Sequence, residues 1–429
     1  MDVRNRLTRY LPPFASDYAG AASALYGMGG MVVLCDAGCC TDHYVFYDEP
    51  RWLQEQTNVF STTLRSMDAV LGCDKDIIER CCALARSLPE SPRFVAFLGT
   101  PVPALVGMDA RGIACEIEAA LDIPSIGLDM TGFRYYDHGI EMACKKLIER
   151  FAPEDGERAS RNDSDPISVN IIGATPLDLG SAANMDAIVD ALEDAGLSVN
   201  ARLPWTADIE EIARIPQADA NLAVSASGVK VACLLERRFH TPYVAARPMI
   251  AAADPAVGAG DDPAAADTGS DLDTAIDTAV GAGDTSDAAK GALLAGIVDA
   301  VKTAVSNAQS GMPGFLARAA DAEGKRVLVV GDQVAANSVA WLAAESYPDA
   351  CVTVSSPFAW DTSLAAPQDF RFEGEFDLAE KTATLQPDLI IADPMYDFLT
   401  RKVPGLSDAR FVPFIHPAVS SKLHWKDMP

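Results

Sequence analysis

The chain has 429 residues, of which 49% are hydrophobic, and a formal net charge of −27 at pH 7. This length is more than one hydrophobic core usually serves, so we expect two or three domains. The acidity excludes ordinary nucleic-acid binding, because phosphate backbones select positively charged surfaces. No apolar run is long enough to span a bilayer and no secretory signal is recognisable, which predicts a cytoplasmic protein without a membrane partner.

The first cysteine-rich segment is MVVLCDAGCCTDH, at residues 31–43. MVVL predicts a strand that delivers Cys35, Asp36, Cys39 and Cys40 into a loop containing glycine. Iron–sulfur clusters need thiolates, and they need small residues whose backbone amides can face the sulfurs. These four residues are therefore candidate metal ligands. The alternative is a loop of small residues with incidental cysteines, since no CxxC…CxxC pair is present.

Short apolar runs followed by Gly or Asp, and then by a helical pattern, recur along the rest of the chain. They lie at 94–98, 167–172, 222–224, 326–330 and 389–391. This is the βαβ signature of parallel sheets, in which ligands bind at the carboxyl ends of the strands. The candidate crevice residues at such ends are Gly173, Ser225, Gly331, Asp332 and His416.

Two polar residues have simpler interpretations as structural residues. Asp137 precedes the helical pattern GIEMACKKLIER and is expected to cap that helix. His416 follows the apolar run FVPFI, and a lone histidine at a strand end is more often a hydrogen-bonded structural residue than a ligand.

Composition divides the chain into four parts. Between Asp254 and Asp287 there are nine Asp and no Lys or Arg, which predicts a flexible insertion that cannot bury enough apolar surface to order itself. We expect an N-terminal α/β domain with the cysteine loop at 1–163, a second Rossmann-like domain at 164–250, the acidic insertion at 251–291, and a third Rossmann-like domain at 292–429.

Common catalytic and nucleotide-binding motifs are absent from the sequence. There is no GxxxxGK[ST], and Gly331-Asp332-Gln333 is not a dinucleotide loop. There is also no GxSxG and no HExxH. Direct binding of ATP or NAD is therefore not expected.

The order of several segments carries a family resemblance. DAGCC, FVAFLGTPVPALVGMD and IPSIGLDMTGFRYYDHGIEMA are followed by VNIIGATPLDLGS, KRVLVVGDQVAANSVAWLA and LQPDLIIADPMYDFL. This order resembles that of nitrogenase component 1 type oxidoreductases. The resemblance implies three Rossmann-like domains with parallel sheets flanked by helices and a ligand crevice between them. It also implies pairing with itself or with a sister subunit, and electrons from an ATP-dependent iron–sulfur reductase.

The resemblance further implies a [4Fe–4S] cluster at the subunit interface, and here the sequence departs from the family pattern. Gly38-Cys39 matches the Gly-Cys position, but the two other cysteine positions fall at Ser16 and at or next to Pro101. Cys35, Cys40, Asp17 or Asp36 could substitute, or a partner could supply ligands. The cysteine that holds the large metal cofactor in dinitrogen-reducing subunits falls near Val224, so dinitrogen reduction is not expected.

The leading hypothesis is thus a nitrogenase-like oxidoreductase subunit that reduces a substrate other than dinitrogen. The alternative is a metal-free scaffold or a small-ligand binding protein that retains the fold. The cysteine loop favours the first hypothesis, and the missing cysteines at Ser16 and Pro101 favour the second.

Overall fold

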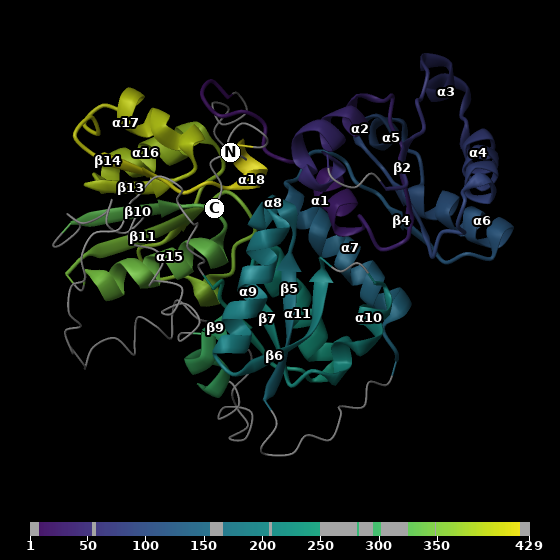
Figure 1. Cartoon of the computed structure of the whole chain (residues 1–429). Coiled ribbons are helices and arrows are strands. Elements are labelled where there is room, and N and C mark those ends of the chain that lie inside the picture. Colours follow the sequence, from purple (N-terminus) through teal and green to yellow (C-terminus); the bar gives the residue numbers. More distant parts are fainter. Residues whose placement is uncertain are drawn as a thin grey trace.

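The computed structural model describes residues 8–53, 57–154, 166–205, 208–248, 281–282, 295–301, 325–347 and 349–420. Three sheets flanked by helices make up this part of the chain, and all their strand pairs are parallel except one (Figure 1). The predicted α/β class with three Rossmann-like units is confirmed. No helix in the described ranges is long and apolar enough to cross a membrane.

The N-terminal sheet has the strand order β2-β1-β3-β4. Side chains alternate between its two faces, because successive residues of a strand point to opposite sides. Met31 and Val33 pack against α4 and α6, whereas Val32 and Leu34 pack against α1 and α7. The strands are β1 (Met31–Leu34), β2 (Val59–Ser61), β3 (Val95–Leu98) and β4 (Ser125–Leu128), and the helices are α1 (Asp17–Ala24), α2 (Cys39–His43), α3 (Ser66–Leu71), α4 (Asp74–Ser87), α5 (Pro101–Val106), α6 (Ala110–Leu121) and α7 (Tyr136–Phe151).

The second sheet has the order β6-β5-β7-β8-β9, and only β9 runs antiparallel to its neighbour. Asn170 and Asn221, on adjacent strands, are fully buried and bonded to each other at 2.9 Å, so burial leaves these amides satisfied. The strands are β5 (Ile167–Ala174), β6 (Leu197–Pro204), β7 (Ala220–Ala223), β8 (Tyr243–Ala245) and β9 (Gly281–Ala282), and the helices are α8 (Pro176–Leu179), α9 (Ala182–Asp194), α10 (Glu210–Arg214) and α11 (Ala226–Phe239). The predicted insertion at 251–291 lies outside the described residues except for β9.

The third sheet has the order β12-β11-β10-β13-β14. Its central strand β10 is Arg326–Val330, as the sequence predicts, because an apolar run bounded by Lys325 and Gly331 has no room to shift. The other strands are β11 (Cys351–Ser356), β12 (Phe370–Arg371), β13 (Leu389–Ala392) and β14 (Arg410–Pro413), and the helices are α15 (Gln333–Ser346), α16 (Glu375–Leu385), α17 (Phe398–Lys402) and α18 (Pro417–Ser420).

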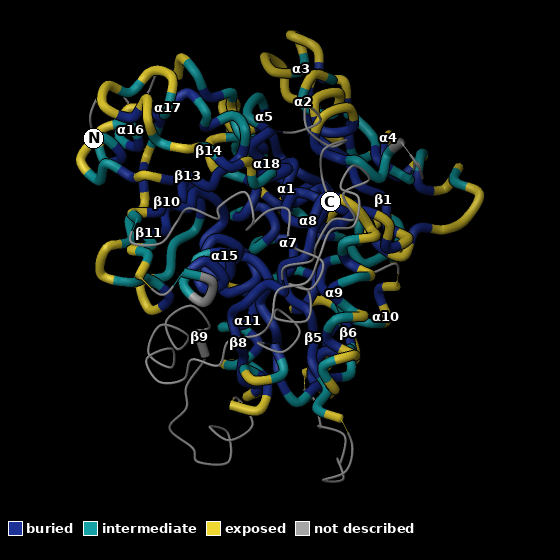
Figure 2. Tube along the Cα trace, turned by 60° about the vertical axis from the view of Figure 1, so that its left-hand side comes forward, coloured by how far each residue is buried: buried dark blue, intermediate teal, exposed yellow. Residues whose placement is uncertain are grey.

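The N-terminal segment ties the first and third units together. The backbone N–H groups of Arg9, Tyr10 and Leu11 donate to the carboxylate of Glu375 on α16, at 2.6, 2.8 and 3.0 Å. The chain then enters α1, and Ala15 N–H donates to the carbonyl of Ala418. Buried residues therefore run continuously through the centre, where the three units meet (Figure 2).

Candidate functional site

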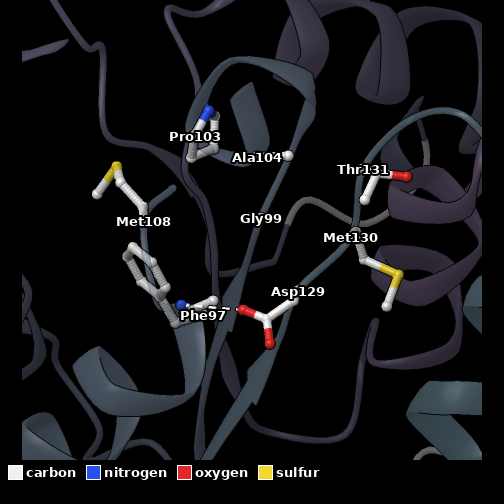
Figure 3. Close-up of a pocket in the computed structure, with 9 residues that line it drawn as sticks. Phe97, Gly99, Pro103, Ala104, Met108, Asp129, Met130 and Thr131 are labelled. Carbon is white, nitrogen blue, oxygen red and sulfur yellow. Dashed lines mark hydrogen bonds between the residues drawn. The ribbon is translucent and has the colours of Figure 1, made fainter. Parts of the chain in front are cut away.

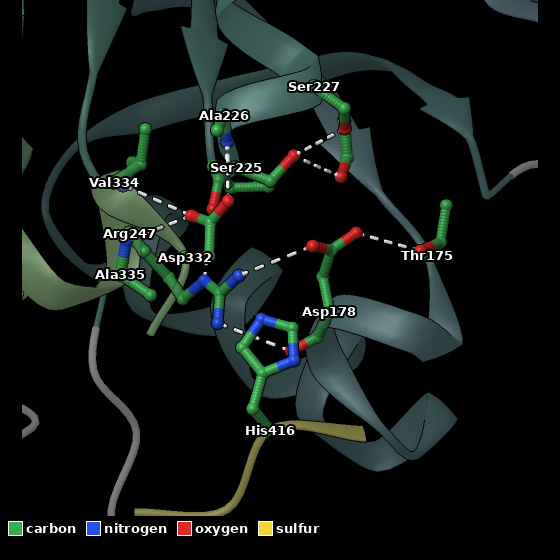
Figure 4. A network of polar contacts seen from close by, with 12 residues as sticks. Thr175, Asp178, Ser225, Ala226, Ser227, Arg247, Asp332, Val334, Ala335 and His416 are labelled. Carbon is green, nitrogen blue, oxygen red and sulfur yellow. Dashed lines mark hydrogen bonds and ion pairs between the residues drawn. The ribbon is translucent and has the colours of Figure 1, made fainter. Parts of the chain in front are cut away.

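The carboxyl ends of the second and third sheets face each other, and Asp332 joins them. Asp332 follows β10, and one of its oxygens accepts N–H groups of Val334 and Ala335 at the start of α15, at 3.0 and 3.2 Å. Its other oxygen accepts the N–H of Ala226, the first residue of α11, at 2.8 Å (Figure 4). Helix N-termini of this kind bind phosphate in nucleotide-binding folds. Here a carboxylate of the chain itself takes that place.

Arg247 follows β8 and reaches into the same junction. Its Nε donates to the carbonyl of Val224 at 2.9 Å, and its Nη1 donates to the carbonyl of Asp178 at 3.2 Å. Its backbone N–H donates to Ser338 on α15, which ties the second unit to the third. The buried guanidinium lies 3.9 Å from an Asp178 carboxylate oxygen, while Nη2 has no hydrogen-bond partner among the described residues.

Asp178, on α8, lies at the centre of this polar cluster. The hydroxyls of Tyr136 and Thr175 each donate to its carboxylate at 2.7 Å. The pKa of Asp178 is raised to about 7, first by burial and then by the nearby Asp332 charge, while Arg247 opposes the shift. Asp178 therefore holds a proton more readily near neutral pH than an ordinary carboxyl group does.

His416 completes the cluster from the third unit. Its backbone N–H donates to the Asp393 carboxylate at 2.8 Å, and its Nε2 lies 3.4 Å from the Tyr136 hydroxyl. Burial, and secondarily the Arg247 charge, lowers the pKa of His416 to about 3, so the ring is neutral. Its Nδ1 has no hydrogen-bond partner among the described residues.

Most predicted crevice residues meet at this junction. Ser225 donates to the carbonyl of Gly173 at 2.7 Å. Gly173 has a φ of +87°, and a Cβ there would lie 2.4 Å from the Cα of Gly228, so only glycine allows this close approach. Gly331 lies one residue before Asp332, and its N–H bonds to Ser355 within the third sheet.

The sequence reasoning placed the stretch 173–180 at the crevice without naming Asp178, it missed Arg247, and it assigned Asp137 wrongly. Asp178 follows strand β5 and Arg247 follows strand β8, so strand-end position was the available signal. The predicted cap role of Asp137 is wrong, since Tyr135 is the N-cap of α7. The Asp137 carboxylate instead accepts the N–H of Ala359 at 2.7 Å, in the third unit, because the helix start faces that unit.

The cysteine loop splits into an inner and an outer part. Cys35 continues the alternation of Met31 and Val33, so its side chain points into the core against α4 and α6. Its thiol lies 3.9 Å from the sulfur of Met108, and burial raises its pKa to about 12. The buried Asp36 carboxylate accepts the N–H of Thr41 at 2.8 Å and the hydroxyl of Ser61.

Cys39 and Cys40 form the outer part, at the start of α2. Gly38, with a φ of +106°, turns the chain so that Cys39 is exposed and Cys40 half-buried. Burial, and then the neighbouring Cys39 thiol, raises the pKa of Cys40 to about 11. The two thiols are thus close to each other on an accessible face.

The other two positions at which the resemblance implies cluster cysteines lie close to Cys40. The Tyr18 side chain lies beside both Ser16 and Cys40. A Cβ at Gly132 would lie 2.4 Å from Pro101 and 3.6 Å from the Tyr18 ring, so Pro101 borders the same place. The carboxylate of Asp17 is buried and accepts the N–H groups of Thr131 and Gly132, so it is not available as a ligand at this place.

A [4Fe–4S] cluster fits this place only if thiolates come from elsewhere as well. The three positions converge, but Ser16 and Pro101 replace two of the thiols. Within the described ranges, no group of three or more His, Cys, Asp or Glu could hold a metal ion. One chain therefore supplies too few donors to hold a cluster alone, and its donors fit a cluster that is shared with a partner.

A cavity of about 190 Å³ lies at the carboxyl ends of β3 and β4 (Figure 3). It is bordered by Phe97, Pro103, Met108 and Met130, with Asp129 bonded to the N–H of Ala110 at its side. Sites for drug-sized ligands usually measure about 300–1,000 Å³. This cavity is smaller and mostly apolar, so we do not assign it to a substrate.

With this geometry in place, comparison with known proteins identifies the family. The family model described as nitrogenase component 1 type oxidoreductase matches residues 16–253, more than half of the chain. The chain belongs to this family. Two solved structures of nitrogenase Cp1, at pH 6.5 and pH 5, match with TM-scores of 0.61 and 0.56. They share 13% and 15% identity, cover 97% and 92% of this chain, and are themselves covered to 88% and 82%, which supports the fold.

Curated relatives match over shorter stretches. A light-independent protochlorophyllide reductase polypeptide of Synechocystis is 27% identical over 167 residues, 37% of this chain and 32% of that protein. The nitrogenase iron-molybdenum cofactor biosynthesis protein NifE of Clostridium pasteurianum is 24% identical over 190 residues, 44% of this chain and 39% of that protein. The chain thus spans about a third of the length of the curated relatives that it matches.

Proposed function

We propose that this nitrogenase-like oxidoreductase subunit accepts electrons through a [4Fe–4S] cluster shared at a subunit interface and reduces a substrate other than dinitrogen. The observation that carries the proposal is the accessible pair Cys39 and Cys40, which lies where the Ser16 and Pro101 positions also converge. A thiolate-held cluster would supply single-electron transfer at that place. An ATP-dependent iron–sulfur reductase would be the electron donor, as the family membership implies.

The proposal gives different roles to the outer and the inner residues of the cysteine loop. Cys39 and Cys40 bind the cluster, because they are the thiols of the loop that reach the surface. Cys35 and Asp36 hold the loop in shape from inside, through the packing and hydrogen bonds of a buried thiol and a buried carboxylate.

The three-unit junction would receive the substrate, bordered by Gly173, Ser225, Gly331, Asp332 and His416. Nη2 of Arg247 and Nδ1 of His416 lack hydrogen-bond partners among the described residues, and this supports binding of a small polar group at the junction that accepts from Nη2 or donates to Nδ1. Asp178 and the Tyr136 hydroxyl bonded to it hold a proton beside that place. A reduction that adds electrons to a substrate also consumes protons, and this pair is positioned to supply one.

A metal-free scaffold is the second candidate, and two observations favour it. Ser16 and Pro101 stand where the family pattern has cysteines, and a relative is named as a cofactor biosynthesis protein. Such a scaffold would retain the three-unit junction but would bind no cluster and transfer no electrons.

Iron and acid-labile sulfide decide between these functions. The protein is purified without oxygen, alone and with a sister subunit, and both elements are quantified. We expect about four irons per interface, with the loss of most of this iron in Cys39→Ser. Absence of iron from both preparations would overturn the redox function and leave the scaffold.

A further inference from the structure

The groups of the three-unit junction have almost no surface through which a ligand could reach them. Tyr136 is 0% exposed, His416 is 2% exposed and Asp178 is 4% exposed. A substrate can therefore enter only after a covering segment has moved. Segments that open easily have few hydrogen bonds in regular sheets or helices, so the moving part is expected in irregular chain beside the junction.

Residues 8–15, here called the N-terminal strap, are such a segment. They lie outside every helix and strand and lead from the third unit to the start of α1 (Figure 1). The backbone N–H groups of residues 9–11 all donate to the carboxylate of Glu375, which is itself 2% exposed. The Tyr10 ring also stacks on Phe398, with 5.2 Å between the ring centroids. One carboxylate and one ring stack of the third unit thus hold the start of the strap.

The end of the strap lies between the two segments that carry Tyr136 and His416. The Ala15 N–H donates to the carbonyl of Ala418 at 2.9 Å, in the helix that begins directly after His416. The Ala15 carbonyl accepts the N–H of Tyr136, also at 2.9 Å. The Tyr136 hydroxyl and His416 Nε2 in turn lie 3.4 Å apart in the junction. Movement of Ala15 would therefore release both of the segments that carry these side chains.

Phe14 connects the strap to the junction through ring contacts. Its ring centroid lies 5.9 Å from that of Phe358 and 6.3 Å from that of Tyr396. Phe358 packs directly on Tyr136 and His416, at 5.1 Å in both cases. The buried Tyr396 hydroxyl and His416 Nδ1 have no hydrogen-bond partner among the described residues. Water that enters when Phe14 leaves would supply such partners, which lowers the free-energy cost of opening.

We infer that the N-terminal strap is the lid of the three-unit junction and that Glu375 is its latch. When residues 9–11 leave the Glu375 carboxylate, the strap moves away, Phe14 withdraws, and the space beside Tyr136 and His416 opens to the ligand. The inference rests on the proposed function for the substrate that enters, whereas the opening itself requires neither substrate nor cluster.

The substitution Glu375→Gln tests the latch. Both oxygens of Glu375 accept backbone N–H groups, so a glutamine must turn its own NH2 group towards at least one of these donors. Loss of these charge-assisted hydrogen bonds should raise the population of the open state about tenfold or more. The matched control is Glu380→Gln, which removes the same charge from an exposed position of the same helix, α16.

Two measurements on the full chain follow the opening. Amide hydrogen exchange, read by mass spectrometry, should become about tenfold faster in the strap and at Tyr136, while strand β10 keeps its wild-type rate. Diethyl pyrocarbonate modifies neutral imidazole rings that it can reach, and it should modify His416 about tenfold faster than in the wild type. His43 in the same sample is the reference, because its side chain is 50% exposed. Glu380→Gln should leave every rate unchanged.

A second variant, Tyr10→Ala, loosens the strap without touching the carboxylate. It removes the stack on Phe398, so the exchange of Tyr136 and the modification of His416 should both become about threefold faster or more.

The failures of this inference differ from those of the proposed function. Faster exchange confined to residues 9–11, with unchanged rates at Tyr136 and His416, would overturn the lid, as would unchanged rates everywhere. Faster exchange that includes β10 would overturn the latch, since Glu375 would then support the whole fold. Neither measurement depends on iron, so a chain that never binds iron would contradict the proposed function and leave the lid unaffected.

Discussion

The three-unit junction and the cysteine face are both built at the carboxyl ends of parallel strands, but they differ in which side chains are buried and which are exposed. At the junction, charged groups such as Asp178, Arg247 and Asp332 are buried and contact one another or backbone groups across two units. At the cysteine face, the large apolar side chains of Phe46, Leu105 and Phe133 are exposed. The junction thus buries charge inside the chain, whereas the cysteine face has the composition of half an interface.

The largest effect should come from removing the charge that balances the junction. Arg247→Met leaves the buried Asp178 and Asp332 carboxylates without their cation, and we expect it to lower the free energy of unfolding by about 3–5 kcal/mol. Urea unfolding measures this. The matched control is Arg93→Met, because Arg93 pairs with Asp208 at the surface, and its loss should stay below about 1 kcal/mol. Equal midpoints for both variants would mean that charge does not hold the junction.

Lowering the pH should change the stability contributions of Asp178 and His416 in opposite directions. The pKa of Asp178 is raised to about 7 in the folded chain, so its contribution to stability grows as the pH falls from 7 towards 4. The pKa of His416 is lowered to about 3, so its contribution is lost as the pH falls below about 6.5. Between pH 7 and 5 each change is on the order of 2 kcal/mol, and the two have opposite signs.

Single variants should reveal each contribution to the pH dependence. Relative to wild type, Asp178→Asn should lose about 2 kcal/mol of unfolding free energy on going from pH 7 to 5, and His416→Gln should gain about as much. Urea unfolding of the three proteins at both pH values gives these differences. Parallel pH profiles for all three would show that neither group titrates as its burial implies.

Strand-end chemistry explains how much of the junction could be predicted from the sequence. Gly173, Ser225 and Asp332 follow apolar runs directly, and a parallel sheet brings such positions together. The meeting of Asp178 with Arg247 carries no local signal, since the two are 69 residues apart and belong to different strand–helix units. Likewise Asp332 was recognisable as a strand-end residue, but its bond to Ala226 depends on how two sheets face each other.

The cysteine loop shows the reverse case, in which a local signal was present but was not used. Cys35 continues the alternation of Met31 and Val33, which places it on the same face of the sheet as those core residues. The small residues that follow suggested a loop beginning at Cys35. β1 does end at Leu34, but the Cys35 N–H still donates to the carbonyl of Leu98 on β3, so the alternation of side chains continues for one more residue. Exposure of Cys39 depends on the turn at Gly38, which the sequence indicated through that glycine.

Serine substitutions sharpen the contrast within this loop. Cys35→Ser places a hydroxyl in an apolar core and should lower the free energy of unfolding by about 1 kcal/mol, with the iron content unchanged. Cys39→Ser should change stability by less than about 0.5 kcal/mol, because that side chain is exposed, while it removes iron. Urea unfolding of the iron-free proteins and iron analysis provide both readouts. Loss of iron from a stably folded Cys35→Ser protein would mean that the Cys35 thiol is a cluster ligand.

The smallest effect on folding is expected at the exposed apolar side chains of the N-terminal unit, where the comparison of the two regions is most direct. Leu105→Ser and Phe376→Ser both shorten exposed apolar side chains, so neither should change the free energy of unfolding of the isolated chain by more than about 0.5 kcal/mol. Only Leu105 lies in the N-terminal unit, on α5. If the cysteine face is the subunit interface of the proposed function, the loss of Leu105 should weaken subunit pairing about tenfold or more, as expected for an apolar residue at the centre of an interface, whereas Phe376→Ser should leave it unchanged. Sedimentation over a range of concentrations measures both dissociation constants, and an equal effect of the two substitutions would mean that the cysteine face is ordinary surface.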